Sequence, residues 1–185
     1  MTDPLPLACA CGTVRGALAP PPPAGLRCVC YCADCRAYAD RLSQPLTPGG
    51  GSMIYQTVPT RVILAAGRER VAALRMTERG VFRFYAACCG TPLANTAPAD
   101  GLPVLGVMEA WMTGDEAARK AALGPCRYGV FKRGATGPLP SGQAGMKRHL
   151  AAMLALAIGG MARGRRTSPF FEAGRPIAEP KVVPA

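Results

Sequence analysis

The chain has 185 residues, 49% of them hydrophobic, which is enough for one well-packed core and a small appendage. Its formal net charge is +11, and we interpret this first as a basic, solvated surface that permits an anionic partner. Nine cysteines stand beside one histidine, which excludes a two-Cys, two-His zinc finger and the histidine-rich catalytic zinc sites. No basic segment followed by an apolar run opens the sequence, so we expect no secretory signal and a cytoplasmic protein whose cysteines are ligands or reactive thiols rather than disulfides.

The first third of the chain predicts short elements around clustered cysteines. Residues 5–18 predict a short strand or knuckle that turns at Gly12. The proline run at 20–23 predicts a rigid spacer, since proline cannot occupy a central strand. A strand over 26–32 and a short helix over 33–42 are expected next, followed by a loop that contains three consecutive glycines.

The middle of the chain has the pattern of a strand meander. Short β-favouring runs, separated by turn-like pieces, recur at a spacing typical of an antiparallel sheet. We expect strands at 54–58, 61–65, 71–76, 81–85 and 104–110.

The last third predicts two helices and a tail. Thr113 and Glu116 form a capping-box pattern for a helix that ends at Gly124, and a strand is expected at 127–131. Residues 146–162 give the strongest helix signal, but the apolar part is too short to cross a bilayer, and we favour a core helix over an interfacial membrane helix. Phe170 and Phe171 predict a tail that docks by its aromatic side chains. We expect a β domain over 1–135 and a helix with an extended tail, packed on it, over 136–185.

The cysteine spacing predicts metal ligation by sulfur. In an extended strand, residues i and i+2 point to the same face, so Cys9 and Cys11 can converge on one ion. Cys88 and Cys89 are adjacent and can share an ion only at a kinked turn, which Gly90 permits. Cys89 is the expected partner of the first pair, and Cys88 is either the fourth ligand or a spectator.

A second set of thiols lies around the predicted strand end. Cys30 and Cys32 share a face, and Cys35 completes a three-thiolate set across a tight turn. Cys28 lies about 13 Å along the strand from Cys32, too far for one tetrahedral ion, and is expected to be a buried thiol. Three thiolates leave a fourth position open, as in catalytic zinc sites.

These motifs resemble the glutathione-dependent formaldehyde-activating enzymes and the related centromere protein V domains. The matching pieces are a Cys-x-Cys-Gly at 9–12, a Cys-x-Cys-x-x-Cys-Arg at 30–36 and an aromatic strand that ends in Cys-Gly-Thr-Pro-Leu at 89–93. The resemblance covers roughly residues 7–110. The chain departs from it at Tyr31, where the family usually has histidine, and at Ala86, where the late motif usually has cysteine.

The resemblance implies a mainly β fold, a β-tent of the Mss4-like kind built from short antiparallel strands, here with a C-terminal helical extension. It implies one or two Zn²⁺ ions: a structural site with Cys9, Cys11 and Cys89, joined by Cys88 if it is a ligand, and an open site with Cys30, Cys32 and Cys35. The implied activity is carbon–sulfur lyase chemistry on glutathione adducts of small aldehydes, and Arg36 or Arg27 is expected to bind carboxylates of the thiol.

Two other functions stay open. A basic domain that is stabilised by structural zinc can bind nucleic acid or a protein partner without catalysis, and nucleic acid is the less favoured partner. Alternatively, the Cys88–Cys89 and Cys32–Cys35 pairs can be redox thiols. His149, among apolar helix residues, is expected to be a surface or core histidine, and Trp111 a core or rim residue.

Overall fold

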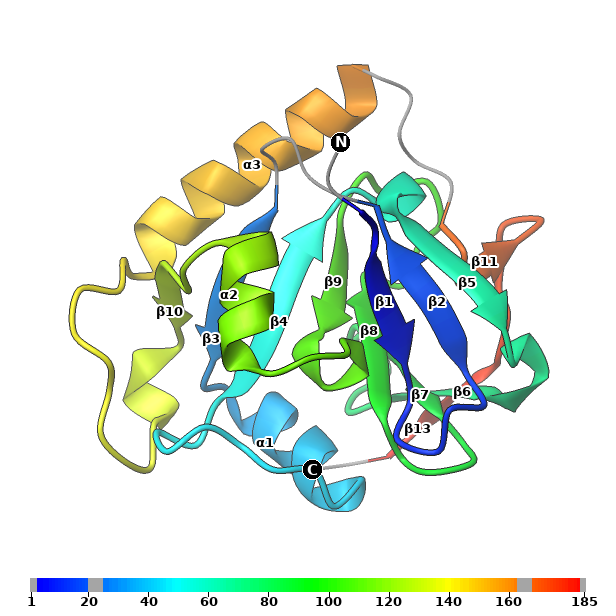
Figure 1. Cartoon of the computed structure of the whole chain (residues 1–185), viewed down its shortest axis with the longest axis horizontal. Helices are drawn as coiled ribbons and strands as arrows, with labels where there is room; N and C mark the ends of the chain where they lie inside the picture. Colours follow the sequence, from blue (N-terminus) through cyan, green and yellow to red (C-terminus); the bar gives the residue numbers. More distant parts are fainter. Residues whose placement is uncertain (1–2, 20–24, 163–167, 184–185) are drawn as a thin grey trace.

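A computed structural model of the chain describes residues 3–19, 25–162 and 168–183. The predicted proline spacer at 20–23 lies outside them. In the described residues the protein is mainly β, with thirteen strands and three α-helices (Figure 1). The helices are α1 (Ala33–Arg41), α2 (Glu116–Leu123) and α3 (Met146–Ala162), and single 3₁₀ turns occur at Pro59–Arg61, Arg68–Arg70, Glu109–Trp111 and Lys132–Gly134.

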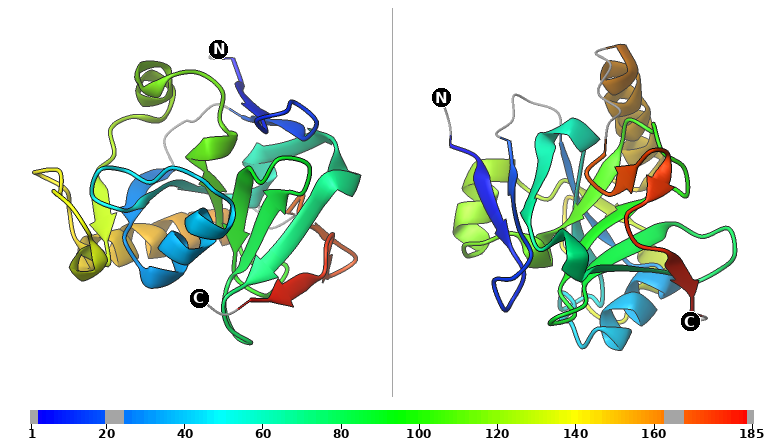
Figure 2. Two further views of the ribbon diagram at one scale, coloured as in Figure 1. Left: turned by 90° about the horizontal axis from the view of Figure 1, so that it is seen from below. Right: turned by 90° about the vertical axis from the view of Figure 1, so that its right-hand side faces the viewer.

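Most strands belong to one large mixed sheet. In spatial order it contains β10 (Tyr128–Val130), β3 (Leu26–Cys30), β4 (Ser52–Thr57), β9 (Leu105–Met108), β8 (Pro92–Thr96), β7 (Phe82–Ala86), β6 (Val71–Arg75) and β13 (Pro180–Val182). A three-stranded sheet of β1 (Leu5–Ala8), β2 (Arg15–Leu18) and β5 (Val62–Ala66) lies beside it (Figure 2), and β11 (Phe171–Glu172) pairs with β12 (Arg175–Pro176) in a small hairpin.

The mainly β prediction is confirmed, and each expected strand of the meander overlaps an observed one. The expectation of antiparallel strands alone is wrong at both edges of the large sheet, where β10 pairs with β3 and β13 pairs with β6 in parallel. The chain reaches both edges by long connections that contain α2 or α3, and such crossovers permit parallel pairing. Strand β8 was not predicted because its residues 92–96 mix proline, alanine and polar side chains.

An aromatic cluster at the centre of the core holds the C-terminal tail. The Phe170 ring stacks on Phe84 with centroids 4.7 Å apart, and it meets Trp111 edge-on at 6.2 Å. All three side chains are fully buried. The prediction that the tail docks by its aromatic residues is therefore confirmed, and Trp111 is a core residue.

Helix α2 begins differently from the prediction. Its N-cap is Asp115, whose carboxylate accepts a hydrogen bond from the backbone N–H of Ala118 at 2.8 Å. The expected cap, Thr113, instead donates its hydroxyl to the carbonyl of Pro6 at 3.0 Å and so ties the segment to β1. The helix ends at Gly124, as predicted, where φ is +80°.

Helix α3 forms where it was predicted, but the expectation of a core helix is wrong. Only His149, Leu156 and Gly160 are buried, and the outward face carries Leu150, Leu154, Ile158 and Met161, each at least 45% exposed. His149 lies edge-on to Tyr128, and its Nε2 is 2.7 Å from the side-chain oxygen of Gln56. Among the described helices, none is long and apolar enough to cross a membrane.

Truncation of Phe170 tests how much the tail contributes to stability. We expect Phe170→Ala to lower the free energy of unfolding by about 3–5 kcal/mol, because it leaves a cavity between Phe84 and Trp111. The matched control Leu150→Ala, at a residue 57% exposed on α3, should change it by less than about 0.5 kcal/mol. Urea denaturation measures both, and similar losses in the two variants would contradict this assignment of the core.

Candidate metal centres

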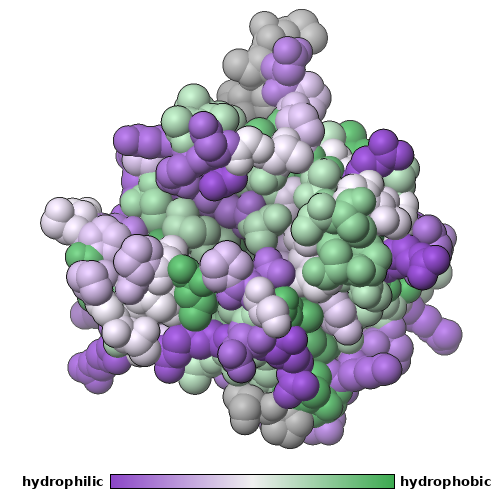
Figure 3. Space-filling model, turned by 60° about the horizontal axis from the view of Figure 1, so that its bottom comes forward, coloured by the Kyte–Doolittle hydropathy of each residue, from purple (hydrophilic) through white to green (hydrophobic). Residues whose placement is uncertain are grey.

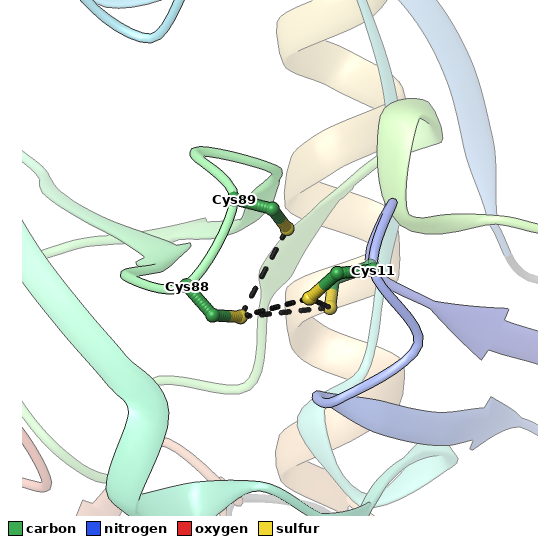
Figure 4. Close-up of side chains that lie close together, drawn as sticks. Cys11, Cys88 and Cys89 are labelled. Carbon is green, nitrogen blue, oxygen red and sulfur yellow. Dashed lines mark hydrogen bonds between the residues drawn. The ribbon is translucent and has the colours of Figure 1, made fainter.

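Four cysteine thiols converge where two turns meet. Cys9 and Cys11 lie in the turn between β1 and β2, while Cys88 and Cys89 lie in the turn between β7 and β8 (Figure 4). The Sγ atom of Cys88 is 3.3 Å from that of Cys11 and 3.9 Å from those of Cys9 and Cys89. All four sulfur atoms lie within 4.8 Å of one another, so the structure brings together all four predicted ligands, Cys88 included.

The backbone of both turns explains this convergence. Gly12 and Gly90 take φ values of +75° and +71°, which an L-amino acid with a side chain rarely adopts. The N–H of Gly90 donates to the carbonyl of Ala86 at 2.8 Å, which closes the turn and brings both neighbouring cysteines to one side. The N–H of Ala10 donates to the Thr91 hydroxyl at 2.9 Å and joins the two turns.

The spacing of this four-cysteine cluster fits a tetrahedral metal ion. A Zn–S bond of about 2.3 Å places tetrahedral sulfur ligands about 3.8 Å apart. The Sγ atoms of Cys9 and Cys11 are 3.6 Å apart, and the three distances from the Cys88 sulfur are between 3.3 and 3.9 Å. The backbone N–H of Val14 also donates to the Cys9 sulfur at 3.1 Å, a bond that stabilises a thiolate.

The proton affinities within this cluster diverge. Hydrogen bonds from Thr13 lower the pKa of Cys11 to about 6. Burial and hydrogen bonding to Cys11 raise the pKa of Cys88 to about 12. Thiols this close cannot all lose their protons unless a cation offsets the repulsion of their charges, which is what a bound metal ion does.

A second group of three thiols lies at the end of β3. Cys30 is the last residue of that strand, Cys32 caps the N-terminus of α1, and Cys35 lies in the first turn of the helix. The Sγ atoms of Cys30 and Cys32 are 3.4 Å apart, and all three sulfur atoms lie within 4.8 Å of one another. No fourth His, Cys, Asp or Glu of the described residues belongs to the group, so it offers a metal three ligands.

The two remaining cysteines are outside both groups. Cys28 is 1% exposed, and its burial raises its pKa well above the usual range, as expected for the buried thiol predicted from its distance to Cys32. Cys126 accepts a hydrogen bond from the amide of Gln143 at 3.3 Å. All nine cysteines of the chain are free of disulfide bonds.

A buried arginine accompanies the three-cysteine group. Arg83 is 3% exposed, its Nη1 lies 3.6 Å from the Cys35 sulfur, and its guanidinium lies over the Tyr38 ring. Burial acts against its charge, but the attraction of Cys35 and Cys32 outweighs this and raises the pKa of Arg83. Sequence reasoning missed this residue, although an arginine between Phe82 and Phe84 in a strand must face away from the core side that both rings occupy.

The two arginines predicted to bind substrate carboxylates both have partners within the protein. Arg36 donates from Nη1 to the carbonyls of Tyr31 and Gly134 and so joins the cysteine loop to the turn after β10. Arg27 is buried and ion-paired with Glu109 at 2.6 Å and with Glu116 at 2.7 Å. Tyr31, between two cysteine ligands, is fully buried. A role for Arg36 in substrate binding stays a prediction.

These features define a mainly β protein with two thiol clusters that can hold metal ions. The model of a protein family of unknown function, DUF6151, matches residues 1–181, and the chain belongs to this family. No curated protein matches the chain.

Metal titration tests the ligand assignment. We expect anaerobic titration of the metal-free protein with Co²⁺ to give two bound ions with thiolate charge-transfer absorption. Cys88→Ser should weaken one of them by at least about tenfold, because it removes one of four thiolates. Cys28→Ser, which changes a buried thiol outside both groups, is the control and should leave both ions bound. If Cys88→Ser also left both affinities unchanged, Cys88 would be a spectator.

A second titration tests the role of Arg83. We expect Arg83→Met to weaken Co²⁺ binding at the three-cysteine group by about 10–100-fold, because the thiolates lose a buried neighbouring cation. Arg83→Lys should recover part of this loss. The exposed Arg68→Met is the control, and the four-cysteine cluster should keep its affinity in all three variants. An unchanged affinity in Arg83→Met would show that the thiolates do not need this charge.

Proposed function

We propose that this is a zinc protein related to the glutathione-dependent formaldehyde-activating enzymes, with one structural and one catalytic metal site. The four-cysteine cluster is the structural site, and the three-cysteine group is the catalytic site. The observation that carries the proposal is the group of three converging thiols without a fourth protein ligand. Closed four-ligand sites stabilise folds, whereas sites with three protein ligands bind substrates.

Zinc is the metal that this ligand set favours. Thiolate ligands select Zn²⁺ and Cu(I) over the harder cations, and tetrahedral sulfur sites are typical of zinc. Zinc held by three thiolates supplies a mild Lewis acid with affinity for a further sulfur atom. We therefore propose one structural and one catalytic Zn²⁺ ion.

The proposed reaction cleaves or forms the carbon–sulfur bond of a hemithioacetal. In cleavage, the C–S bond breaks, the sulfur gains a proton, and the hydroxyl oxygen loses its proton as the C–O bond becomes the aldehyde carbonyl, so no oxidant or reductant is needed. Cys30 and Cys35 are 6% and 4% exposed, while Cys32 is half-buried, so the group is accessible from the side of Cys32. Arg83 balances the thiolate charge from the buried side.

The finer fold and location are part of the same proposal. The β1–β2 turn and the β7–β8 turn, each carrying two cysteines and joined by the bond from Ala10 to Thr91, support a β-tent of the Mss4-like kind. A reducing cytoplasm is the compartment that would keep all nine cysteines free of disulfide bonds.

Exchange spectroscopy on zinc-loaded protein tests the activity. We expect the protein to accelerate the interconversion of glutathione and formaldehyde with their adduct, measured by NMR magnetisation exchange against the uncatalysed rate. Cys32→Ser should abolish the acceleration and leave metal in the four-cysteine cluster. The control Cys126→Ser should accelerate the exchange as the parent protein does. A panel of small aldehydes that showed no metal-dependent acceleration would refute the lyase proposal.

The net charge supports a second candidate, a non-catalytic module that binds nucleic acid. Twenty-two basic residues against 11 acidic ones give the chain a pI near 9.6. On the face seen in Figure 3, however, apolar patches interrupt the hydrophilic surface. Binding to DNA or RNA that persists at near-physiological salt and weakens steeply as salt rises would favour this candidate over the enzyme.

A further inference from the structure

A cavity adjoins the three-cysteine group on the accessible side. Its volume is ≈ 610 Å³, and Cys32 is one of its lining residues. The remaining lining comes from the start of α1, the end of β10 with the turn that follows it, and the start of α3. The side chains that matter below are Phe131, Lys132, Arg133 and Met146.

The parallel register of β10 and β3 places the cavity beside the metal group. Val130 pairs with Cys30, and the carbonyl of Val130 accepts a hydrogen bond from the N–H of Tyr31 at 3.0 Å. Phe131 therefore follows β10 at the same level at which the chain continues from Cys30 to Cys32. Arg36 bonds the carbonyls of Tyr31 and Gly134, so the turn that carries Phe131 is fixed to the cysteine loop.

Phe131 has an unusual conformation and exposure for a large aromatic residue. Its φ and ψ are +55° and +38°, in the left-handed region, where a residue other than glycine is strained. Its side chain is 55% exposed. The fold thus holds an aromatic ring at a conformationally costly position without burying it, which is a pattern found at ligand sites.

The cavity combines apolar walls with one available cation. Phe131, Met146 and Ala33 offer apolar surface. The ammonium of Lys132 already donates to the carbonyl of Gln143 at 2.8 Å. Arg133 is exposed, and it makes no hydrogen bond or ion pair with the described part of the chain.

We propose that this cavity binds the substrate of the three-cysteine group, and that the substrate is an arylmethyl thiol, or an adduct of one, that carries a carboxylate. The inference rests on the proposed function, since it takes the open position of the metal as the place where sulfur binds. The ring packs against Phe131 and Met146, and the carboxylate reaches Arg133. The cavity thus binds an apolar thiol more tightly than glutathione, whose body is polar along its whole length, so glutathione is the weaker substrate of the two.

The test measures the affinity of thiols for the protein loaded with Co²⁺ at both sites. Binding is monitored through the ligand-field absorption bands of Co²⁺, which change when a thiol becomes the fourth ligand at the three-cysteine group. The probes are para-(mercaptomethyl)benzoate, benzyl mercaptan, mercaptopropionate and glutathione. We expect the benzoate to bind about tenfold more tightly than mercaptopropionate, because the ring leaves water for apolar surface. Benzyl mercaptan should fall between them.

Variants assign the selectivity to residues. Phe131→Gly should weaken the two ring-bearing thiols about tenfold and leave mercaptopropionate within about twofold. Arg133→Gln should weaken only the carboxylate-bearing thiols, by about three- to fivefold at low salt. Leu102→Ala, at a residue 43% exposed between β8 and β9, and Arg79→Gln, at an exposed arginine, are the matched controls and should change no affinity.

A stability readout separates a binding role from a structural one. Glycine adopts positive φ without strain, so Phe131→Gly should keep the melting temperature within about 2 °C of the parent protein. Phe131→Asn, which also tolerates this conformation, is the second variant and should repeat both results. A melting temperature lowered alike in both variants would make Phe131 a structural residue and overturn the proposal.

The failures of the two proposals differ. Thiols that bind with equal affinity, or glutathione that binds most tightly, would overturn the arylmethyl-thiol assignment and leave the open metal site intact. A spectrum that no thiol changes would overturn the open site itself, and the proposed function with it.

Discussion

The repulsion between closely packed thiolates is the constraint on which both candidate sites depend. The fold holds seven thiols in two groups, within 4.8 Å of one another in each, at positions set by backbone turns rather than by adaptable side chains. Without a cation, only some thiols of each group can ionise, and the pKa of Cys11 falls while that of Cys88 rises. A metal ion removes this conflict, so its binding free energy becomes part of the stability of the fold.

One strand physically connects the two groups. Arg83 on β7 reaches the sulfur of Cys35, and the same strand leads through Ala86 into the turn that carries Cys88 and Cys89. Its aromatic residue Phe84 stacks on Phe170 in the core and accepts, through its carbonyl, a hydrogen bond from the Tyr38 hydroxyl of α1 at 2.9 Å. A displacement of β7 would therefore disturb both thiol groups and the packing of the tail.

The parts of the molecule that sequence reasoning predicted are those set by local patterns. Alternation of cysteines at Cys9 and Cys11, and at Cys30 and Cys32, predicted their pairing because a strand returns to the same face every two residues. Contacts between distant segments had no such signal: the parallel addition of β10 beside β3 brings Phe131 near Cys32 across about a hundred residues. The exposure of α3 was missed for a related reason. The composition of an apolar helix does not show whether the rest of the protein buries one side of it or surrounds it completely.

The late cysteine pair departs from the pattern of the formaldehyde-activating enzymes that the sequence resembles, and the conformation of the backbone explains how. Residue 86, where the late motif of those enzymes has cysteine, is a fully buried alanine at the end of β7, and the first thiol of the turn is Cys88 instead. Two adjacent cysteines point in opposite directions on a strand, but the turn that Gly90 closes onto Ala86 bends the backbone between them, so both thiols lie within 4.8 Å of those of Cys9 and Cys11. The turn therefore sets the spacing of the cysteines along the chain, because a metal ion requires only that the sulfur atoms lie at suitable distances from it.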